Sequence, residues 1–484
     1  MSECCFVTPR DESKLDPIKT CLYINNELAQ TGLFSGAKKD THEAQNSTWR
    51  ISPEPFFVTP EMVAKIESFG PHFLKFYQAV QRLYEHSVQG RQPDWIRQYL
   101  ETGKSELVLD YNRMRRFRKQ VPFIIRPDIL INENEEIFVS ELDSIPGGFG
   151  LLSKISSIYA QLGYQIVGGA NGIVEQLVKS FRGLTPNLNP VVAIIVSQES
   201  QDYFPEMISV AASLRDAGLE TYAINPEEII FQEDGLYLKV NDKVAKIDIV
   251  YRFFELFDLK NIPKIDLILY AIRKQLVTVT PPLKSYLEEK LLFALLHHPA
   301  LEAYWEQNLG QDSFHVLKTI LPRTWIIDPR PLPPHATIPN LYIEKKAVTS
   351  WEQLKLATKK QREYVVKVSG YSEKSWGSRG VSVGHDLSTE DWSAVLDEAQ
   401  EEFVQNPSIL QEFHKGKRFT LQYYDFETEQ MKKMPGRVRL CPYYFVENEQ
   451  VTLGGILATI CPLDKKLIHG MVDSIMVPTA FLRS

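Results

Sequence analysis

The sequence lacks the features of a secreted or membrane-spanning protein. Its five cysteines in 484 residues are scattered and odd in number, so they form neither a disulfide framework nor a set with zinc-ligand spacing. No apolar run approaches the roughly 20 residues that a membrane-spanning helix needs. The first residues, MSECCFVTPRDESKLD, are polar and lack the apolar core of a signal peptide. We therefore expect a cytoplasmic protein with reduced cysteines and no membrane partner.

The chain also lacks an excess of positive charge. Its net charge is -7 and its pI is near 5.9, which argues against a broad electrostatic surface for nucleic acid. Hydrophobic residues make up 44% of the sequence and charged residues 24%, as in an ordinary globular protein. We expect no nucleic-acid partner. The sequence leaves the oligomeric state open, with a homodimer as one option.

Helical and strand patterns follow one another along the first third of the chain. Helical spacing of apolar residues extends from Pro60 to about Gln120, with an interruption expected at Gly70-Pro71. Two short β runs follow, PFIIRPDILI and EEIFVSEL, separated by turn formers. This part is predicted to form a helical region and then two strands that can pair as a hairpin.

The rest of the chain combines parallel and antiparallel patterns. Residues 191–224 read as strand, helix and strand, which implies a parallel crossover unit. Residues 285–307 have a helical pattern, and residues 418–460 contain three runs that predict antiparallel strands. The predicted fold class is therefore mixed α/β (α+β).

The first candidate site is formed by Arg126 and Asp128 on one strand and Glu141 and Asp143 on the next. Residues i and i+2 of a strand point to the same face. If the two strands pair, three carboxylates and a guanidinium converge on one patch. Such carboxylates repel one another unless a cation neutralises them, and oxygen ligands suit Mg²⁺. A solvated strand face with incidental ion pairs is the alternative.

A glycine-rich turn follows directly after this acidic pair. Gly147, Gly148 and Gly150 let backbone amides approach an anion closely. A metal-bound phosphate would explain acidic ligands beside such a turn. A plain turn without a ligand is the alternative.

A lysine on an apolar strand marks the second candidate site. Lys367 in YVVKVSG is costly to bury without a partner. The Gly/Ser-rich residues 370–384 that follow resemble a lid over phosphates, although they contain no Walker A motif. A lysine that reaches solvent from the strand end is the alternative. The string GVSVG around Ser382 matches the serine-hydrolase pattern, but its polar surroundings favour a chance match.

Further candidates lie in the C-terminal strands. Gln411 and Glu412 lie at the end of SILQEF. Their backbone groups can bind the edge of an adenine, and a carboxylate can bind a ribose hydroxyl. An exposed strand end is the alternative. Arg437 and Arg439 lie two apart on one strand, where they can stabilise a charged intermediate or serve as surface charges.

Taken together, these segments resemble the eukaryotic-type glutathione synthetases and, more distantly, glutathionylspermidine synthase. Both belong to the circularly permuted branch of the ATP-grasp superfamily. The resemblance extends from about Arg126 to the C-terminus. Glu141-Leu-Asp143 and its turn look like the family's magnesium-binding ExN segment, with Asp143 in place of the usual asparagine. The resemblance also gives Arg252 a substrate-contacting role and makes Lys290 and Lys367 the lysines that bind the ATP phosphates.

The resemblance is incomplete in two loops. The family has a tight loop of glutamate and glycines after the second lysine, where this chain has GYSEKSWGSRG with Glu373 as the nearest candidate ligand. The family's basic substrate loop is not clearly matched by CPLDKKLIHGMVD. From the residue patterns and the resemblance together, the candidate magnesium ligands are Asp128, Glu141, Asp143 and Glu373; the candidate nucleotide-binding residues are Lys290, Lys367, Gly147, Gly148, Gln411 and Glu412; and the candidate catalytic residues are Arg126, Arg252 and Arg437.

The resemblance implies an ATP- and Mg²⁺-dependent ligase that joins a carboxylate to an amine through an acyl phosphate and releases ADP and phosphate. The substrates are a small acid and an amine, such as an amino acid, a short peptide or a polyamine. The implied fold is a circularly permuted ATP-grasp core with an inserted parallel-sheet domain and a helical N-terminal region. Its parts are residues 1–120 (lead-in and helices), 121–185 (metal and phosphate part of the core), 186–280 (substrate domain) and 281–484 (ATP-binding part of the core). An ATP-grasp protein that binds nucleotide or peptide without ligation, and a small-molecule kinase, are the alternatives.

Overall fold

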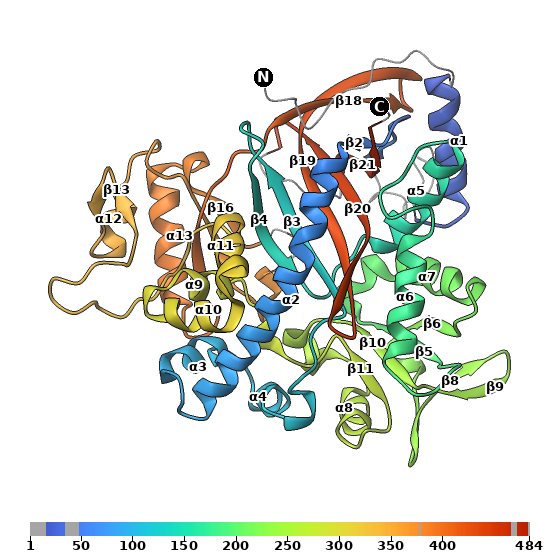
Figure 1. Ribbon diagram of the computed structural model, residues 1–484, viewed down its shortest axis with the longest axis horizontal. Coiled ribbons are helices and arrows are strands. Elements are labelled where there is room, and N and C mark those ends of the chain that lie inside the picture. The colour runs from blue at the N-terminus through green and yellow to red at the C-terminus, as the bar shows by residue number, and fades with distance from the viewer. Residues whose placement is uncertain (1–15, 34–47, 376, 378, 466–471, 483–484) are drawn as a thin grey trace.

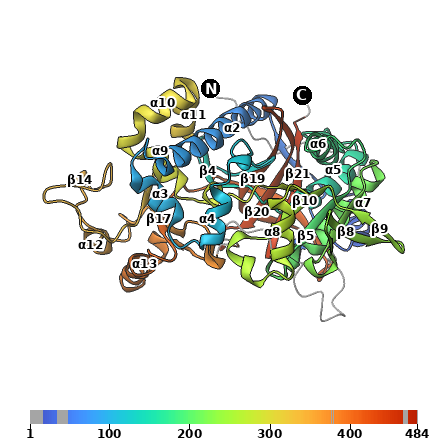
Figure 2. The ribbon, with the colours of Figure 1, turned by 90° about the horizontal axis from the view of Figure 1, so that it is seen from below.

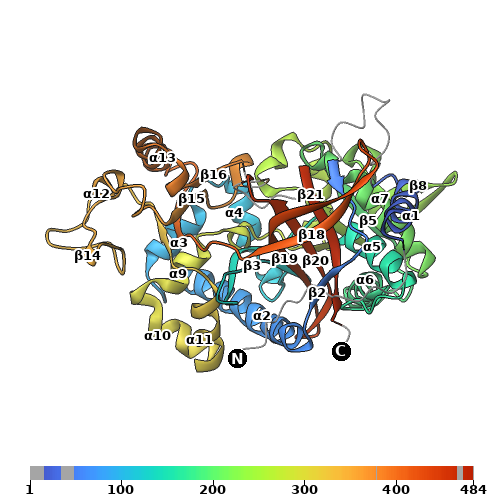
Figure 3. The same cartoon turned by 90° about the horizontal axis from the view of Figure 1, so that it is seen from above.

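A computed structural model of the chain describes residues 16–33, 48–375, 377, 379–465 and 472–482. An eight-stranded sheet lies between two smaller units. The α/β unit lies at one end of the molecule, and a four-stranded antiparallel sheet with its helices lies at the other (Figures 1, 2 and 3). None of the helices in the described ranges is long and apolar enough to cross a membrane.

The eight-stranded sheet has the order β1-β21-β20-β19-β3-β4, with β18 paired to β19 and β2 to β21. The long strands β18, β19 and β20 pair antiparallel, as the three C-terminal runs predicted. The β3–β4 hairpin pairs with the same β19. The strands are β1 (Thr48–Arg50), β2 (Phe56–Val58), β3 (Ile124–Ile131), β4 (Ile137–Asp143), β18 (Arg418–Asp425), β19 (Gln430–Glu447), β20 (Gln450–Pro462) and β21 (Val472–Phe481).

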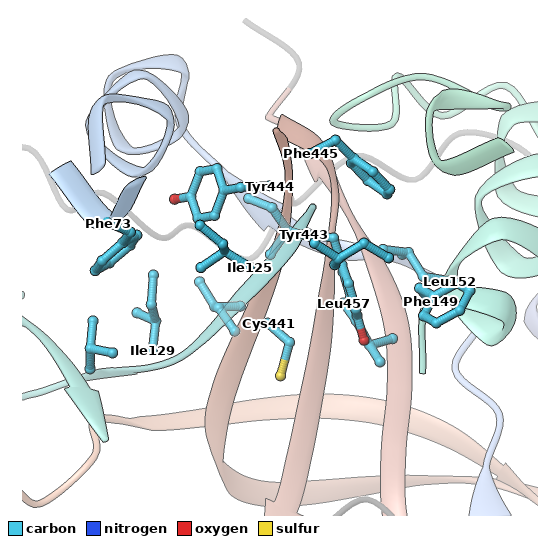
Figure 4. Close-up of a cluster of buried hydrophobic side chains, with 14 of the residues drawn as sticks. Phe73, Ile125, Ile129, Phe149, Leu152, Cys441, Tyr443, Tyr444, Phe445 and Leu457 are labelled. Carbon is cyan, nitrogen blue, oxygen red and sulfur yellow. The ribbon is translucent and has the colours of Figure 1, made fainter. Parts of the chain in front are cut away.

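Helices pack on both faces of this sheet. Successive side chains of β19 point to opposite faces, so neighbouring residues contact different helices. Tyr444 contacts the ring of Phe73 on α2 (Pro60–Val88), with 5.9 Å between ring centroids. Tyr443 contacts Phe149 on α5 (Phe149–Gln161) at 6.3 Å, on the other side (Figure 4). Helix α6 (Gly172–Gly183) also packs on β19 and β20.

Helix α2 is continuous, so the expected interruption at Gly70-Pro71 is wrong. Pro71 lies inside the helix. A Cβ at Gly70 would lie 2.7 Å from Val451 Cγ1 and 2.9 Å from the Tyr444 ring. Glycine therefore lets the helix approach the sheet closely, and this packing offsets the local cost of the proline.

The α/β unit has the parallel crossover that the sequence predicted. Its sheet has the order β11-β10-β5-β6, and every neighbouring pair is parallel. A three-stranded antiparallel sheet is attached to it. The elements are β5 (Val192–Val196), α7 (Phe204–Asp216), β6 (Thr221–Ile224), β7 (Ile230–Gln232), β8 (Gly235–Val240), β9 (Lys243–Lys246), β10 (Ile249–Phe253), α8 (Ile265–Arg273) and β11 (Thr278–Thr280).

The four-stranded antiparallel sheet at the other end has the order β12-β17-β15-β16. It packs on helices α12 and α13 around the buried indole rings of Trp325, Trp351 and Trp392. Ser382 lies in the middle of β16 rather than at a strand-to-helix turn, so the serine-hydrolase match is a chance one. The elements are β12 (Thr324–Ile326), α12 (Trp351–Lys355), β15 (Tyr364–Val368), β16 (Val381–Val383), α13 (Thr389–Glu401) and β17 (Ser408–Glu412).

The helix predicted over residues 285–307 is broken in the structure. The chain forms η6 (Ser285–Glu288), α9 (Leu292–His297) and α10 (Glu302–Leu309). At the first break, Lys290 N donates to Ser369 O (3.0 Å) and Leu291 N to Ser369 Oγ (2.9 Å). These long-range hydrogen bonds replace helical ones and hold Lys290 at the end of β15.

The remaining elements connect these units. The helices are α1 (Pro17–Ala29), α3 (Asp94–Glu101), α4 (Glu106–Asn112) and α11 (Gln311–Ile320), and the short strands are β13 (Tyr342–Ile343) and β14 (Lys346–Ala347). The short 3-10 helices are η2 (Arg115–Phe117), η3 (Gln198–Tyr203), η4 (Pro226–Glu228), η5 (Leu256–Asn261), η7 (Pro299–Leu301), η8 (Glu373–Ser375) and η9 (Gly384–Asp386).

Candidate active site

The β3–β4 hairpin brings Arg126 opposite Asp143, as the same-face spacing predicted. Arg126 Nη2 lies 3.0 Å from Asp143 Oδ2, and Arg126 Nε donates to Asp128 Oδ1 at 2.9 Å. One guanidinium therefore holds two of the three predicted carboxylates.

Asp128 is enclosed by partners and does not fit the predicted role of a magnesium ligand. Arg126 Nε and Cys441 Sγ donate to its Oδ1, and Arg439 Nη1 donates to its Oδ2 at 2.9 Å. The residue is 1% exposed. With both oxygens engaged, Asp128 instead orients Arg126 and Arg439.

Glu141 lies between the two predicted phosphate lysines. Its Oε2 is 3.6 Å from Lys290 Nζ. Burial disfavours the charged carboxylate, but Lys290 and then Lys367 outweigh this effect and lower its pKa to about 2. Glu141 is therefore an anion at any physiological pH.

Lys367 is buried rather than solvent-facing, so the alternative of a strand end in solvent is wrong. Its Nζ donates to Ser140 O (3.0 Å) and to Gln411 Oε1 (2.9 Å). Its pKa is lowered to about 8, because burial disfavours the charged amine and Lys290 repels it, while Glu141 opposes the shift. Strand β15 thus buries its lysine together with two hydrogen-bond acceptors.

Two adjoining cavities meet at Glu141 and Lys290. The first, here called the sheet cavity, has a volume of about 420 Å³ and lies between the β12–β17 sheet and the hairpin. The second, the turn cavity, has about 440 Å³ and lies against the start of α5 and the α/β unit. Residues that line both are Glu141, Lys290, Ser375, Gly377 and Arg439. A larger cavity of about 740 Å³, around the proline-rich residues 328–339, contains none of the predicted site residues.

The sheet cavity contains polar atoms with no partner. Within the described residues, Arg437 Nε, Arg439 Nε and His414 Nε2 are buried and form no hydrogen bond. Such groups are costly unless a ligand satisfies them. The two arginines occupy neighbouring same-face positions on β19, as their spacing predicted.

His414 is a site residue that the sequence reasoning missed. Its ring stacks on Phe138, with 3.5 Å between centroids and a 7° angle. Burial lowers its pKa to about 4, so the imidazole is neutral at physiological pH. A single histidine after a strand matches no motif. Phe138, which is far from it in the sequence, stacks on it in the folded chain, and the two rings form an aromatic wall.

Gln411 and Glu412 both line the sheet cavity. The Gln411 side chain is already engaged, since its Oε1 accepts from Lys367 and its Nε2 donates to Thr324 Oγ1 at 3.3 Å. Glu412 is half-buried, and burial raises its pKa. Of the two side chains, Glu412 is the one available to a ligand.

The glycine turn donates a backbone hydrogen bond to a carboxyl group of the protein itself. Gly148, with φ 88°, precedes α5, and Gly150 N donates to Glu206 Oε1 at 2.8 Å. A Cβ at Gly150 would lie 2.6 Å from Glu206 Cγ. Burial raises the pKa of Glu206 to about 7, although the turn amides oppose this. Gly147 and Gly148 line the turn cavity and not the sheet cavity, and their nucleotide contact stays a prediction.

Two further predicted residues lie outside both cavities. Arg252 is fully buried, donates to Phe254 O (2.8 Å) and to two proline carbonyls, and pairs with Glu288. Glu373 is exposed in η8. Neither position fits the predicted direct contact with substrate or magnesium. Residues 466–471 of the C-terminal loop that was compared with the family's basic substrate loop lie outside the described residues.

Two carboxylates in the turn cavity escaped the sequence reasoning. Glu255 follows β10, and Glu288 ends η6. Burial and then repulsion from Glu288 raise the pKa of Glu255 to about 8. The pKa of Glu288 is also raised by burial, although Arg252 opposes this. Their spacing in the sequence gives no sign that both line one cavity.

Comparisons with known proteins support the fold. No protein-family model matches the chain, and no curated protein matches it. A solved glutathione synthetase-like effector from Globodera pallida, in its apo form, matches with a TM-score of 0.58 over 97% of this chain and 98% of its own, at 11% identity. A protein provisionally described as a gamma-glutamylcysteine synthetase from Methylobacillus flagellatus matches at a TM-score of 0.42 and 14% identity, over 81% of this chain and 86% of its own. The chain thus has a glutathione synthetase-like fold of mixed α/β class, as the resemblance implied.

Proposed function

We propose that the chain is an ATP-dependent ligase that joins a carboxylate to an amine, on a circularly permuted ATP-grasp core. The observation that carries the proposal is the junction of the two cavities, where Glu141 and Lys290 line both. A nucleotide in one cavity can there meet a substrate in the other. The likeness to a glutathione synthetase-like fold supports the same class of reaction.

The sheet cavity is suited to a nucleotide. Its volume of about 420 Å³ falls within the roughly 300–1,000 Å³ of small-molecule sites. Lys290 and Lys367 supply positive charge, and the unpartnered Nε atoms of Arg437 and Arg439 can donate to phosphate oxygens. The Phe138–His414 stack offers an aromatic wall for a base, beside Glu412.

Magnesium fits part of the predicted ligand set. In the described ranges, no three His, Cys, Asp or Glu side chains are placed to hold a metal by themselves. Mg²⁺ in phosphate sites commonly uses one or two carboxylates and completes its shell with phosphate oxygens and water. Glu141 and Asp143 can supply these carboxylates, whereas Asp128 and Glu373 do not fit. Bound there, the ion would neutralise charge on the transferred phosphoryl group.

The reaction needs two transfers. The substrate carboxylate attacks the γ-phosphorus, so a carboxyl O–P bond forms, the bond to the β-phosphate oxygen breaks, and ADP leaves. The amine nitrogen then attacks the acyl carbon, a C–N bond forms, and inorganic phosphate leaves as the nitrogen loses its proton. Arg439, which lines both cavities, and Arg126 orient the carboxylate. Positioning and charge suffice, and no protein nucleophile is required.

One observation favours a second candidate, a protein that binds nucleotide without ligation. Two of the four predicted magnesium ligands are misplaced, since Asp128 is enclosed and Glu373 is exposed. A reduced ligand set weakens phosphoryl transfer more than nucleotide binding.

Phosphate release with Mg-ATP, measured against pools of amino acids, short peptides and polyamines, tests the proposal. We expect release to require both an acid and an amine, and mass spectrometry to detect an amide. Glu141→Gln should abolish release, whereas Glu306→Gln, on the exposed face of α10, should not. A stable phosphate ester would indicate a kinase. Nucleotide binding without release would indicate the second candidate.

A further inference from the structure

The cavity around the proline-rich residues 328–339, here called the outer cavity, lies outside the candidate active site. Its volume of about 740 Å³ is within the roughly 300–1,000 Å³ of small-molecule sites. Pro322, which lies just before β12, lines the sheet cavity, whereas Arg323 and Thr324 line the outer cavity. Within the described residues, none lines both the outer cavity and one of the other two. The outer cavity is therefore a separate space, one strand away from the proposed nucleotide site.

The walls of the outer cavity offer apolar surface. Trp325 and Trp351 line it, and both indole nitrogens are already engaged. Trp325 Nε1 donates to Pro339 O at 2.7 Å, and Trp351 Nε1 donates to Asp328 O at 2.8 Å. Leu332, in the proline-rich connection, also lines the cavity and is exposed although it is large and apolar. These side chains can cover the apolar part of a ligand.

Most of the charged side chains that line the outer cavity have a partner of opposite charge. These ion pairs are Arg330–Asp328, Lys355–Glu352 and Lys318–Glu302. His297 and His298 add no charge at physiological pH, because burial lowers the pKa of both, that of His297 to about 4. Arg323 is the remaining charged residue of the lining.

The guanidinium of Arg323 is exposed in the outer cavity and, within the described residues, forms no hydrogen bond or ion pair. The backbone of Arg323 is fixed, since its carbonyl oxygen accepts from Glu412 N at 2.9 Å. Burial raises the pKa of Glu412 and Arg323 opposes this through space, but the two side chains do not pair. A guanidinium can bind a carboxylate through two parallel hydrogen bonds. One unpaired positive charge beside apolar walls therefore matches a singly charged anion with an apolar body.

We propose that the outer cavity binds a small monocarboxylate with an apolar body, such as an aryl-substituted acid, and that Arg323 pairs with its carboxylate. The apolar body then covers Leu332 and the exposed edges of Trp325 and Trp351. A phosphate monoester carries close to two negative charges and would find one free cation, whereas an amine would meet Arg323 without a free carboxylate. The inference does not depend on the proposed ligase function, because the outer cavity is separate from the candidate active site.

Binding of three small probes to the full chain, measured by ligand-observed NMR, tests the proposal. 3-Phenylpropionate and 3-phenylpropionamide have the same carbon skeleton and differ in charge, whereas acetate has the charge without the apolar body. We expect 3-phenylpropionate to bind at least about tenfold more tightly than either of the other two. It should also bind when a non-hydrolysable ATP analogue is present at saturation, because the sheet cavity is a separate space.

Two exposed positions of the outer cavity can be changed with little risk to the fold. Arg323→Gln should weaken binding of 3-phenylpropionate by about tenfold or more, and Leu332→Ser by about threefold or more. Arg115→Gln and Leu188→Ser are the matched controls, because these exposed residues line none of the three cavities, and they should bind as the wild type does. Equal affinity for the amide, unchanged binding in Arg323→Gln or Leu332→Ser, displacement by the ATP analogue, or no binding to the wild type would each overturn the inference.

Discussion

Glu141 Oε2 and Lys290 Nζ lie 3.6 Å apart at the junction of the sheet cavity and the turn cavity. Glu141 comes from the end of a hairpin strand, and Lys290 from a break between two short helices. A phosphoryl group that moves from a nucleotide in one cavity to a carboxylate in the other has to pass this pair. The pair is therefore the place where nucleotide binding and substrate chemistry can be coupled.

Replacing Lys290 should weaken nucleotide binding directly. Lys290→Met removes a cation beside the proposed phosphate position, and a charged hydrogen bond of about 1.5–3 kcal/mol corresponds to roughly a tenfold to hundredfold loss of affinity. Isothermal titration calorimetry with a non-hydrolysable ATP analogue measures the change. Lys274→Met, at the exposed end of α8, is the matched control and should bind as the wild type does. Unchanged affinity in Lys290→Met would place the phosphates elsewhere.

Glu206 should make stability depend on pH. Burial raises its pKa from 4.5 to about 7 in the folded chain, so the folded state binds more protons than the unfolded state between these values. The free energy of unfolding should therefore fall as pH rises from about 4.5 to about 7, by up to about 3 kcal/mol. Urea unfolding across this range measures the slope, and Glu206→Gln, which cannot titrate, should show a flatter profile. Identical profiles for both proteins would contradict the assignment.

The variant Asp128→Asn tests whether Asp128 orients Arg126 and Arg439 or binds Mg²⁺. Breaking a buried ion pair leaves Arg126 and Arg439 without their shared carboxylate, which should cost about 3–5 kcal/mol of unfolding free energy. This loss should be the same with and without Mg²⁺, because both carboxylate oxygens are already engaged. Asp143→Asn should instead weaken the Mg²⁺ dependence of nucleotide binding. A stability loss in Asp128→Asn that appears only with Mg²⁺ would restore Asp128 as a ligand.

The local patterns of the sequence predicted the parts of the site that depend on strand periodicity. Arg126 and Asp143 face each other because alternation along two paired strands determines which side chains share a face. The position of Lys290 was less predictable, because its helical pattern is interrupted by hydrogen bonds to Ser369, far along the chain. The ligand of the glycine turn was likewise hidden, since Glu206 reaches it from a separate helix. Contacts between distant segments leave no periodic signal.

A buried ion pair between Lys104 and Glu289 should control how Lys290 is held. The two side chains are 1% and 2% exposed, and Glu289 also accepts from Ser369 Oγ, which itself accepts from Leu291 N. Lys104→Met leaves Glu289 as an uncompensated buried charge, so the unfolding free energy should fall by about 3–5 kcal/mol. Affinity for the ATP analogue should fall with it, because the segments on both sides of Lys290 lose a shared anchor.

The double variant Lys104→Met, Glu289→Gln separates the effect of an unpaired buried carboxylate from the effect of losing the Lys104–Glu289 contact. Removing the stranded charge should recover much of the stability, because the larger part of the penalty comes from an unpaired carboxylate rather than from a lost attraction. Nucleotide affinity should recover less, since the neutral amide introduced by Glu289→Gln would still lack its lysine partner. Lys246→Met, which breaks an exposed pair with Asp234, should change neither property. If the single and double variants are equally unstable, the pair acts through packing and not through charge.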